Sequence, residues 1–139
     1  DNGKGLYTTG IGHADALHVS DLDPSRPGLE VFSIQEKFGD AGAKFRDART
    51  GEVIWKKPSV KAGDDGEGPG RGLALDIDPR YEGFECWVAG AGIRGLFDAK
   101  GNVIEKAFLI YDKRGMKIQR KAVDGKGTLI SDKKYIYEY

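Results

Sequence analysis

Cysteine and net charge are what this 139-residue sequence most clearly lacks. Cys86 is the only cysteine, so an intrachain disulfide is excluded. The 22 lysines and arginines balance the 22 aspartates and glutamates, and the formal net charge is zero. A chain without a basic excess has no global field that would draw it to nucleic acid or to an anionic membrane. We therefore expect neither of them as a partner.

Long apolar runs and helical periodicity are missing as well. No stretch approaches the ~20 apolar residues of a transmembrane span. The first ten residues, DNGKGLYTTG, show neither the basic nor the apolar region of a signal peptide. Glycine, by contrast, accounts for 21 residues, which is roughly twice average usage and favours short strands and tight turns. The composition predicts an all-β fold without helices of ten or more residues.

A twelve-residue segment occurs twice, as DLDPSRPGLEVF at 21–32 and as DIDPRYEGFECW at 76–87, with an offset of 55. A repeat of this period indicates stacked supersecondary units such as propeller blades. The shared positions are Asp21, Asp23, Pro24, Gly28 and Glu30 in the first copy and Asp76, Asp78, Pro79, Gly83 and Glu85 in the second.

The strand pattern has the same order in both halves. Strands are predicted at 16–19, 29–34, 43–46 and 52–55, then at 73–77, 84–89 and in a hairpin over 97–104, with a long Gly/Asp loop over 58–72. Both hairpins are built on an Asp-Ala turn that contains glycine, at Asp47 and at Asp98. Each half is therefore predicted to be an antiparallel four-stranded meander, the usual content of a β-propeller blade.

The predicted organisation is a single propeller-type region over 1–139. It consists of two repeat units, at about 16–72 and 73–107, and a divergent C-terminal part over 108–139. Short strands are expected in this last part at 108–111, 117–121, 128–131 and 135–139, with a turn at 112–115.

The repeated segment places oxygen donors around a turn, in the pattern D-x-D-P-x-x-x-G-x-E. Calcium takes six to eight oxygen ligands. Two aspartates could point into one loop, and Glu30 or Glu85 could close the shell. The alternative is that the aspartates only cap backbone N–H groups of a tight turn and the glycine supplies a positive φ. Both interpretations remain open on the sequence alone.

The two histidines, His13 and His18, lie in one short segment beside Asp15 and the first acidic turn. Their spacing does not suit a helical zinc site, so they form either a functional cluster or packed polar residues. Glu36 follows the next strand and could return to the same rim. Arg71 stands between glycines, where it could pair with a substrate carboxylate or neutralise the acidic residues of the preceding loop.

Four segments in this order resemble the rhamnogalacturonan lyases of the eight-bladed propeller type, polysaccharide lyase family 11. GHADALHVSDLDPSRPGLEVF, FRDARTGEVIW, GRGLALDIDPRYEGFECW and the FDAKGNVI hairpin are similar to the family patterns GHGDALHVGDLDP, LRDARTGEILW, DVGRGLAADIDPRYPG and GLYxxKGExI. The likeness is strong over 10–104 and weakens afterwards, where both tryptophans of a family segment are missing from 108–112. Because the family's propeller is several times longer, the resemblance implies a partial propeller of two to three blades, with open sheet edges that could self-associate.

The resemblance implies a secreted or periplasmic calcium-dependent lyase that cleaves pectic rhamnogalacturonan I by β-elimination next to galacturonate. It implies metal ligands at His18, Asp21, Asp23, Glu30 and Glu36, and a second, structural calcium at Asp76, Asp78 and Glu85. Arg71 would be catalytic and, together with His13, would bind substrate. Other active-site residues would lie on blades outside this chain, so little or no lyase activity is expected from the polypeptide alone.

Two further hypotheses compete with a lyase part. One is a non-catalytic, calcium-stabilised module of propeller repeats that binds carbohydrate or another partner. The other is a structural β-domain whose acidic turns are only turns. Trp55 and Trp87 do not discriminate, because each lies in a strand pattern and is expected in the core rather than as a platform for sugar.

Overall fold

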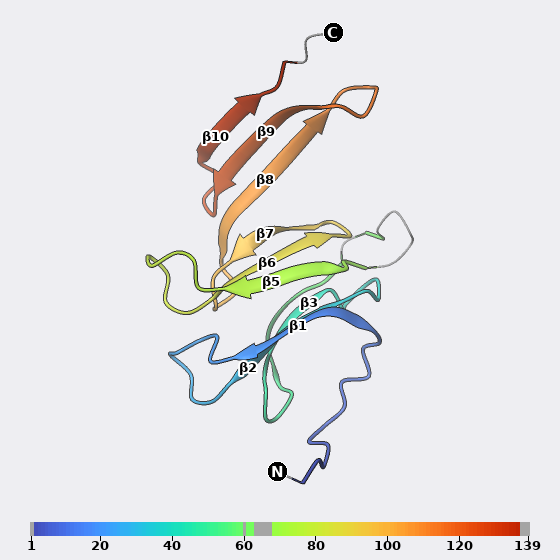
Figure 1. Cartoon of the computed structure of the whole chain (residues 1–139), viewed down its shortest axis with the longest axis vertical. Coiled ribbons are helices and arrows are strands. Elements are labelled where there is room, and N and C mark those ends of the chain that lie inside the picture. The colour runs from blue at the N-terminus through green and yellow to red at the C-terminus, as the bar shows by residue number, and fades with distance from the viewer. Residues whose placement is uncertain (1, 60, 63–67, 137–139) are drawn as a thin grey trace.

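The computed structural model describes residues 2–59, 61–62 and 68–136, and within them the fold consists of ten strands and no helix (Figure 1). The all-β fold class is therefore confirmed. No helix in the described ranges could cross a membrane. The strands are β1 (Ala14–Ser20), β2 (Glu30–Gln35), β3 (Ala43–Asp47), β4 (Val53–Lys57), β5 (Arg71–Leu75), β6 (Glu85–Gly90), β7 (Ile93–Phe97), β8 (Val103–Tyr111), β9 (Lys117–Asp124) and β10 (Leu129–Lys134).

The strands form two antiparallel meanders. The first sheet has the order β1-β2-β3-β4, and the second has the order β10-β9-β8-β7-β6-β5, so within each sheet the strands pair in sequence order, and the chain passes from one sheet to the other between β4 and β5. The first sheet is the four-stranded unit that the sequence predicts. In the second sheet β8 is one continuous nine-residue strand, and β9 and β10 extend the sheet beyond it. The part after residue 107 thus continues the second unit, and Figure 1 shows it reaching away from the first sheet.

Aspartate side chains close the four hairpins that follow β3, β7, β8 and β9. Asp47, Asp98, Asp112 and Asp124 each accept two backbone N–H groups from within the turn, at 2.7 to 3.0 Å. These backbone bonds hold the pKa of Asp47, Asp112 and Asp124 below the ordinary value. Asx-type turns of this kind favour tight strand reversals and fix the pairing of the meanders.

Buried glutamates hold the two acidic turns. The Oε2 atom of Glu30 accepts the backbone N–H groups of Leu22 and Asp23, both at 3.0 Å. Glu85 makes the two equivalent bonds in the second turn, at 2.9 and 2.8 Å. Both glutamates are 1% exposed. The repeated glutamate therefore has a structural role that the sequence did not indicate, as the anchor of each loop.

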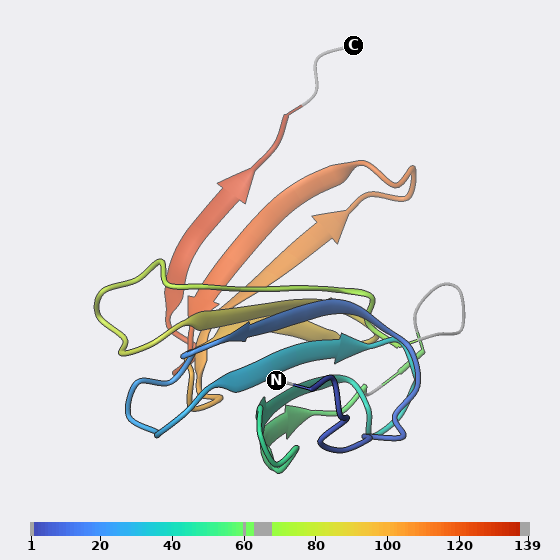
Figure 2. The ribbon, with the colours of Figure 1, turned by 60° about the horizontal axis from the view of Figure 1, so that its bottom comes forward.

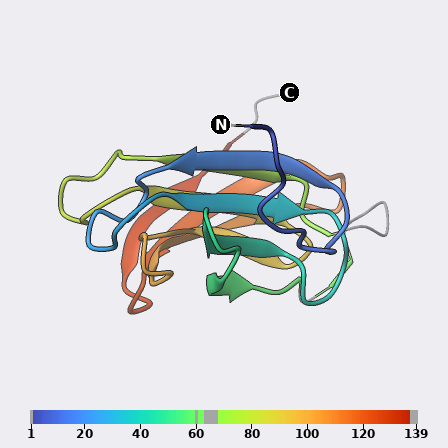
Figure 3. The ribbon, with the colours of Figure 1, turned by 90° about the horizontal axis from the view of Figure 1, so that it is seen from below.

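The hydrophobic core lies between the two sheets, and Figures 2 and 3 show the first sheet stacked against the second. Trp55 belongs to this core: its ring stacks on Phe45 at 5.1 Å, and its Nε1–H donates to the Ala99 carbonyl at 2.8 Å. Trp87 is 43% exposed, so the expectation that it is a core residue is wrong. The core residues are Leu22, Phe32, Ile34, Ala43 and Phe45 from the first unit and Ala74, Cys86, Val88, Ile93 and Phe97 from the second.

Candidate functional site

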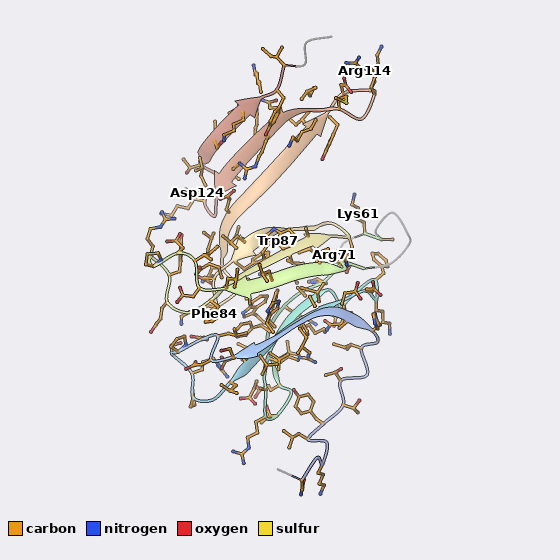
Figure 4. The ribbon with its side chains drawn as sticks, in the orientation of Figure 1. Lys61, Arg71, Phe84, Trp87, Arg114 and Asp124 are labelled. Atoms are coloured by element: carbon orange, nitrogen blue, oxygen red, sulfur yellow. The ribbon has the colours of Figure 1, made fainter. Side chains whose placement is uncertain are left out.

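Four polar residues converge where the first and second sheets meet, at the end of β1 away from the acidic turns. His13 precedes β1 and Asp15 lies on it, whereas Glu36 follows β2 and Arg71 begins β5. The pairing of β1 with β2 brings His13 and Glu36 side by side, and the Glu36 N–H donates to the His13 carbonyl at 3.3 Å. Figure 4 labels Arg71 at its place on β5. The cluster therefore draws on three segments and both sheets.

The side chains of this cluster form a continuous chain of polar contacts. His13 Nδ1 lies 3.0 Å from Glu36 Oε2 and 3.3 Å from Asp15 Oδ1. Arg71 Nη1 donates to Asp15 Oδ2 at 3.2 Å and to the carbonyl of Gly70 at 2.9 Å. The side chains of His13 and Arg71 are 74% and 77% exposed, so solvent or a ligand can reach the cluster directly.

A glycine segment lies against the cluster. A Cβ on Gly68 would collide with the backbone carbonyl of Glu36, whereas a Cβ on Gly70 would lie at ordinary van der Waals distance from Asp15 and Glu36. The N–H of Gly68 donates to the Glu36 carbonyl, which holds the glycine segment against the site. The sequence had offered the preceding acidic loop as the alternative partner of Arg71, but that loop lies outside the described residues.

The strand register separates two groups that the sequence had placed on one rim. Glu36 follows the end of β2 that pairs with the start of β1, whereas Glu30 pairs with Ser20 at the opposite end of β1. Asp23 lies beyond the far end of β1 and is therefore about 20 Å from Glu36, the length of this seven-residue strand. The expectation that Glu36 returns to the rim of the first acidic turn is therefore wrong, and Glu36 joins His13 instead.

His18 and Asp21 do not join the cluster. His18 lies within β1, half-buried, with its ring 6.4 Å from the ring of Phe32. Asp21 is exposed just after β1, in the first acidic turn. Of the residues expected to bind metal or substrate, the structure thus brings together His13, Glu36 and Arg71. It adds Asp15, whose contacts could not be foreseen without the pairing of β1 with β2 and the position of β5.

The carboxylate of Asp23 is held by protein donors. Oδ1 accepts the hydroxyl of Ser25 at 2.6 Å and its backbone N–H at 3.2 Å, and Lys100 Nζ lies 3.4 Å away. Burial alone would raise the pKa of Asp23, but the bonds from Ser25 and the charge of Lys100 outweigh it and hold the pKa below its ordinary value. Lys100 comes from the second unit, so this contact ties the two units together, and no sequence signal identified it.

The second acidic turn is also occupied by protein groups. Arg80 donates Nε–H and Nη2–H to Asp78, and its hydrogen bonds hold the pKa of Asp78 below the ordinary value. Asp76 is exposed. The Oε2 atom of Glu85 accepts the backbone N–H groups of the loop, while its buried Oε1 has no hydrogen-bond partner among the described residues.

The two acidic turns and the cluster at His13 differ in how well their side chains suit calcium. At the acidic turns the carboxylates of Asp23 and Asp78 already accept bonds from Ser25, Lys100 or Arg80, and a cation there would have to displace those donors. The ligand atoms of His13, Asp15 and Glu36 all lie within 4.8 Å of one another, and these side chains are more exposed than Asp23, but a cation there would share Asp15 with Arg71 and both carboxylates with His13. The two carboxylates would supply part of the six to eight oxygen ligands that calcium takes, and water or a ligand carboxylate would supply the rest. The ligand roles expected at the two turns stay predictions.

Comparison with known proteins connects this geometry to a family. Residues 1–113 match the sequence model of the rhamnogalacturonan lyase family 11, C-terminal domain. Rhamnogalacturonan endolyase YesW of Bacillus subtilis (strain 168) is 54% identical over 101 residues, which is 72% of this chain and 15% of that protein. Rhamnogalacturonan exolyase YesX of the same organism is 49% identical over 109 residues, covering 74% of this chain and 17% of that protein.

Solved structures give the same result. The rhamnogalacturonan lyase PL11 of Bacillus licheniformis superposes with a TM-score of 0.62 at 43% identity, over 86% of this chain and 20% of that one. The crystal structure of rhamnogalacturonan lyase YesW superposes with a TM-score of 0.62 at 37% identity, over 97% of this chain and 23% of that one. This chain spans about a sixth of the length of the curated relatives. It belongs to rhamnogalacturonan lyase family 11.

Proposed function

We propose that this chain is part of a calcium-dependent lyase that cleaves pectic rhamnogalacturonan I by β-elimination next to galacturonate. The observation that carries the proposal is the convergence of His13, Asp15, Glu36 and Arg71 at the junction of the two sheets, in a chain of this lyase family. As the resemblance implies, we extend the proposal to a secreted or periplasmic location and to self-association through open sheet edges.

β-Elimination requires that the carboxylate beside the acidic proton be neutralised, since negative charge develops next to it. Arg71 suits this task because its guanidinium is exposed and can pair with a planar carboxylate through two N–H groups. Asp15 holds Arg71 from one side and leaves the rest of the guanidinium facing outward. Calcium, when bound by Asp15 and Glu36, would supply Lewis-acid stabilisation of the same charge.

His13 is assigned to substrate binding in this proposal. Its contacts with Asp15 and Glu36 both use Nδ1, and we therefore propose that Nε2 contacts a hydroxyl of the sugar chain. The two carboxylates orient the ring, and they favour an N–H at Nδ1 in the neutral form. His13 would then position substrate, while the base that removes the proton at C5 belongs to the part of the lyase outside this chain.

Calcium binding tests the metal part of the proposal. The melting temperature of the chain is measured with a chelator and then with added calcium, and we expect calcium to raise it. A ligand that binds only the folded state adds about 2.7 kcal/mol to the free energy of unfolding when its concentration is a hundred times its Kd. Asp15→Asn and Glu36→Gln should abolish the rise, whereas Glu52→Gln, an exposed change in the β3–β4 hairpin, should preserve it. An equal rise in all variants would place the metal elsewhere.

Oligosaccharide binding separates the lyase part from a non-catalytic module. We expect fragments of rhamnogalacturonan I to bind the chain more weakly after Arg71→Ala, with Arg80→Ala as the control for loss of an exposed arginine. Binding that is unchanged by Arg71→Ala would favour the non-catalytic carbohydrate-binding module. Release of unsaturated products by this polypeptide alone would contradict the expectation that the remaining catalytic groups lie outside it.

A further inference from the structure

The face of the first sheet that points away from the second sheet is polar and yet buried. Side chains alternate along a strand, so Phe32 and Phe45 point into the core while their neighbours on β2 and β3 point to this outer face. Figure 3 shows the segment before β1 passing in front of the first sheet, and the ring of Tyr7 from that segment lies against Gly51. We call the four buried polar residues of this face the outer polar group, namely Ser33, Gln35, Lys44 and Arg46.

The hydrogen bonds within the outer polar group leave donors of Arg46 unused. Arg46 is 5% exposed, and its Nη2 donates to the hydroxyl of Ser33 at 3.0 Å. Its Nε and Nη1 atoms are buried and have no hydrogen-bond partner among the described residues. The ion pairs within the same part of the chain do not include Arg46. Because a buried charge without a counter-charge is strongly unfavourable, this guanidinium has both the donors and the charge to hold an anion.

Lys44 adds a second buried cation beside Arg46. The two residues are two positions apart on one face of β3, which places their Cβ atoms about 7 Å from each other. The Nζ atom of Lys44 lies 3.5 Å from Asp40, whose carboxylate is 68% exposed and binds Lys56 more closely, at 2.6 Å. An exposed carboxylate is well screened by water and contributes little to such a pair. Positive charge therefore exceeds negative charge on this buried face.

A cavity of about 300 Å³ lies beside these two cations. Lys44 and Arg46 line it from β3, and Tyr7, Thr8 and Thr9 line it from the segment before β1. None of the described residues that line this cavity is an aspartate or a glutamate. Threonine and tyrosine hydroxyls can donate hydrogen bonds to oxygen atoms, and arginine with lysine is the usual combination for binding carboxylate, sulfate or phosphate oxygens. The lining of the cavity thus suits a negatively charged ligand.

We propose that this cavity binds a small oxyanion, either a carboxylate or a tetrahedral ion such as sulfate. The oxygens of the anion accept the Nε and Nη1 donors of Arg46, and Lys44 shares its charge. The volume is at the lower end of the range for small-molecule sites, so we expect a small ion together with a few water molecules. The site shares no residue with the cluster of His13, Asp15, Glu36 and Arg71, and the inference is therefore independent of the lyase proposal.

Thermal unfolding of the full chain tests the proposal. The melting temperature is measured while sulfate or acetate replaces chloride stepwise at constant ionic strength. We expect at least one of the two anions to raise the melting temperature by several degrees and the rise to saturate, because the anion binds the folded state at one site. Exclusion of sulfate from the protein surface also stabilises proteins, but that effect grows steadily with concentration. A response to sulfate alone would identify a site for tetrahedral ions, and a response to acetate alone a site for carboxylates.

Substitutions of Arg46 locate the site. Arg46→Met should abolish the saturable rise, and in chloride alone it should raise the melting temperature, because it replaces an unpaired buried charge by an apolar side chain of similar length. Arg46→Lys keeps the charge with fewer donors and should weaken the affinity for the anion several-fold. Arg49→Met is the matched control, since it removes an exposed positive charge from the adjacent turn, and it should keep the full rise. An equal rise in Arg46→Met and Arg49→Met, or no saturable rise of the native chain with either anion, would overturn the proposal.

Discussion

Removal of the Asp23 side chain should destabilise the folded chain, with or without calcium. In the structure this carboxylate is 4% exposed and accepts the hydroxyl and the backbone N–H of Ser25, and Lys100 lies beside it. The sequence pattern predicted a calcium ligand at the same aspartate. The two interpretations predict different responses of Asp23→Ala to a chelator, so the substitution decides between them.

The expected magnitude follows from the contacts. Hydrogen bonds to a charged group contribute about 1.5–3 kcal/mol, and because Ser25 and Lys100 are both exposed, their donors turn to water when the acceptor is removed and add no burial penalty. The side chain of Lys100 is 50% exposed, so its ion pair with Asp23 contributes only about 0.5 kcal/mol after solvent screening. We therefore expect Asp23→Ala to lower the free energy of unfolding by about 3 kcal/mol and Lys100→Met to lower it by less than about 1 kcal/mol.

Urea unfolding followed by circular dichroism measures both values, in chelator and in calcium. The Asp23→Ala penalty should be the same in both and should shrink below about pH 4. The pKa of Asp23 is depressed in the folded state, so its contribution is present above the unfolded value and is lost as the pH falls through the folded one. If Asp23→Ala cost nothing in chelator and abolished the stabilisation that calcium gives, Asp23 would be a metal ligand and the reasoning from Ser25 and Lys100 would be refuted.

Three further predictions concern turns and burial. Gly83→Ala should lower the free energy of unfolding, measured by thermal unfolding, by about 2–3 kcal/mol, because its φ is +87° and a Cβ would collide with a backbone carbonyl of the first unit. Gly115→Ala is the matched control: its φ is +79°, nothing lies near its Cβ position, and it should lower the free energy by only about 1 kcal/mol. Cys86 should react with a thiol reagent only after unfolding, since burial raises the pKa of its thiol; reaction in the native state would contradict its position in the core. The free energy of unfolding should fall as the pH drops below about 4, because the pKa values of the turn residues Asp112 and Asp124 are depressed in the folded state. Combined Asn substitutions at both should make the free energy of unfolding depend less on pH in this range.

Much of the fold was predictable because its determinants are local. Asp47 and Asp98 begin turns that can be recognised from a few neighbouring residues, and the repeat marks the two units. The length of β8 was not predictable, since the charged pair at 105–106 interrupts the apolar pattern that signals a strand. Only the pairing of β8 with β9 shows that these residues continue the sheet.

The candidate site was predictable in its members but not in its grouping. His13, Glu36 and Arg71 could be selected by residue type, yet their meeting depends on the register of β1 with β2 and on the position of β5. A difference of six residues between Glu30 and Glu36 sends them to opposite ends of one strand. Lys100 carried no signal at all, because its partner Asp23 is 77 residues away and in another sheet.

The order of strands has a consequence for how the molecule folds. Within each sheet the strands pair in sequence order, so each sheet can form by closing successive hairpins, and the contact order within a sheet is low for an all-β protein. Hairpins form in about 1–10 μs, whereas contacts between distant segments must wait for loop closure. The ion pair of Arg71 with Asp15 spans 56 residues and joins two separately formed sheets. We expect the cluster of His13, Asp15, Glu36 and Arg71 to be completed in the last step of folding and to come apart first when the sheets separate.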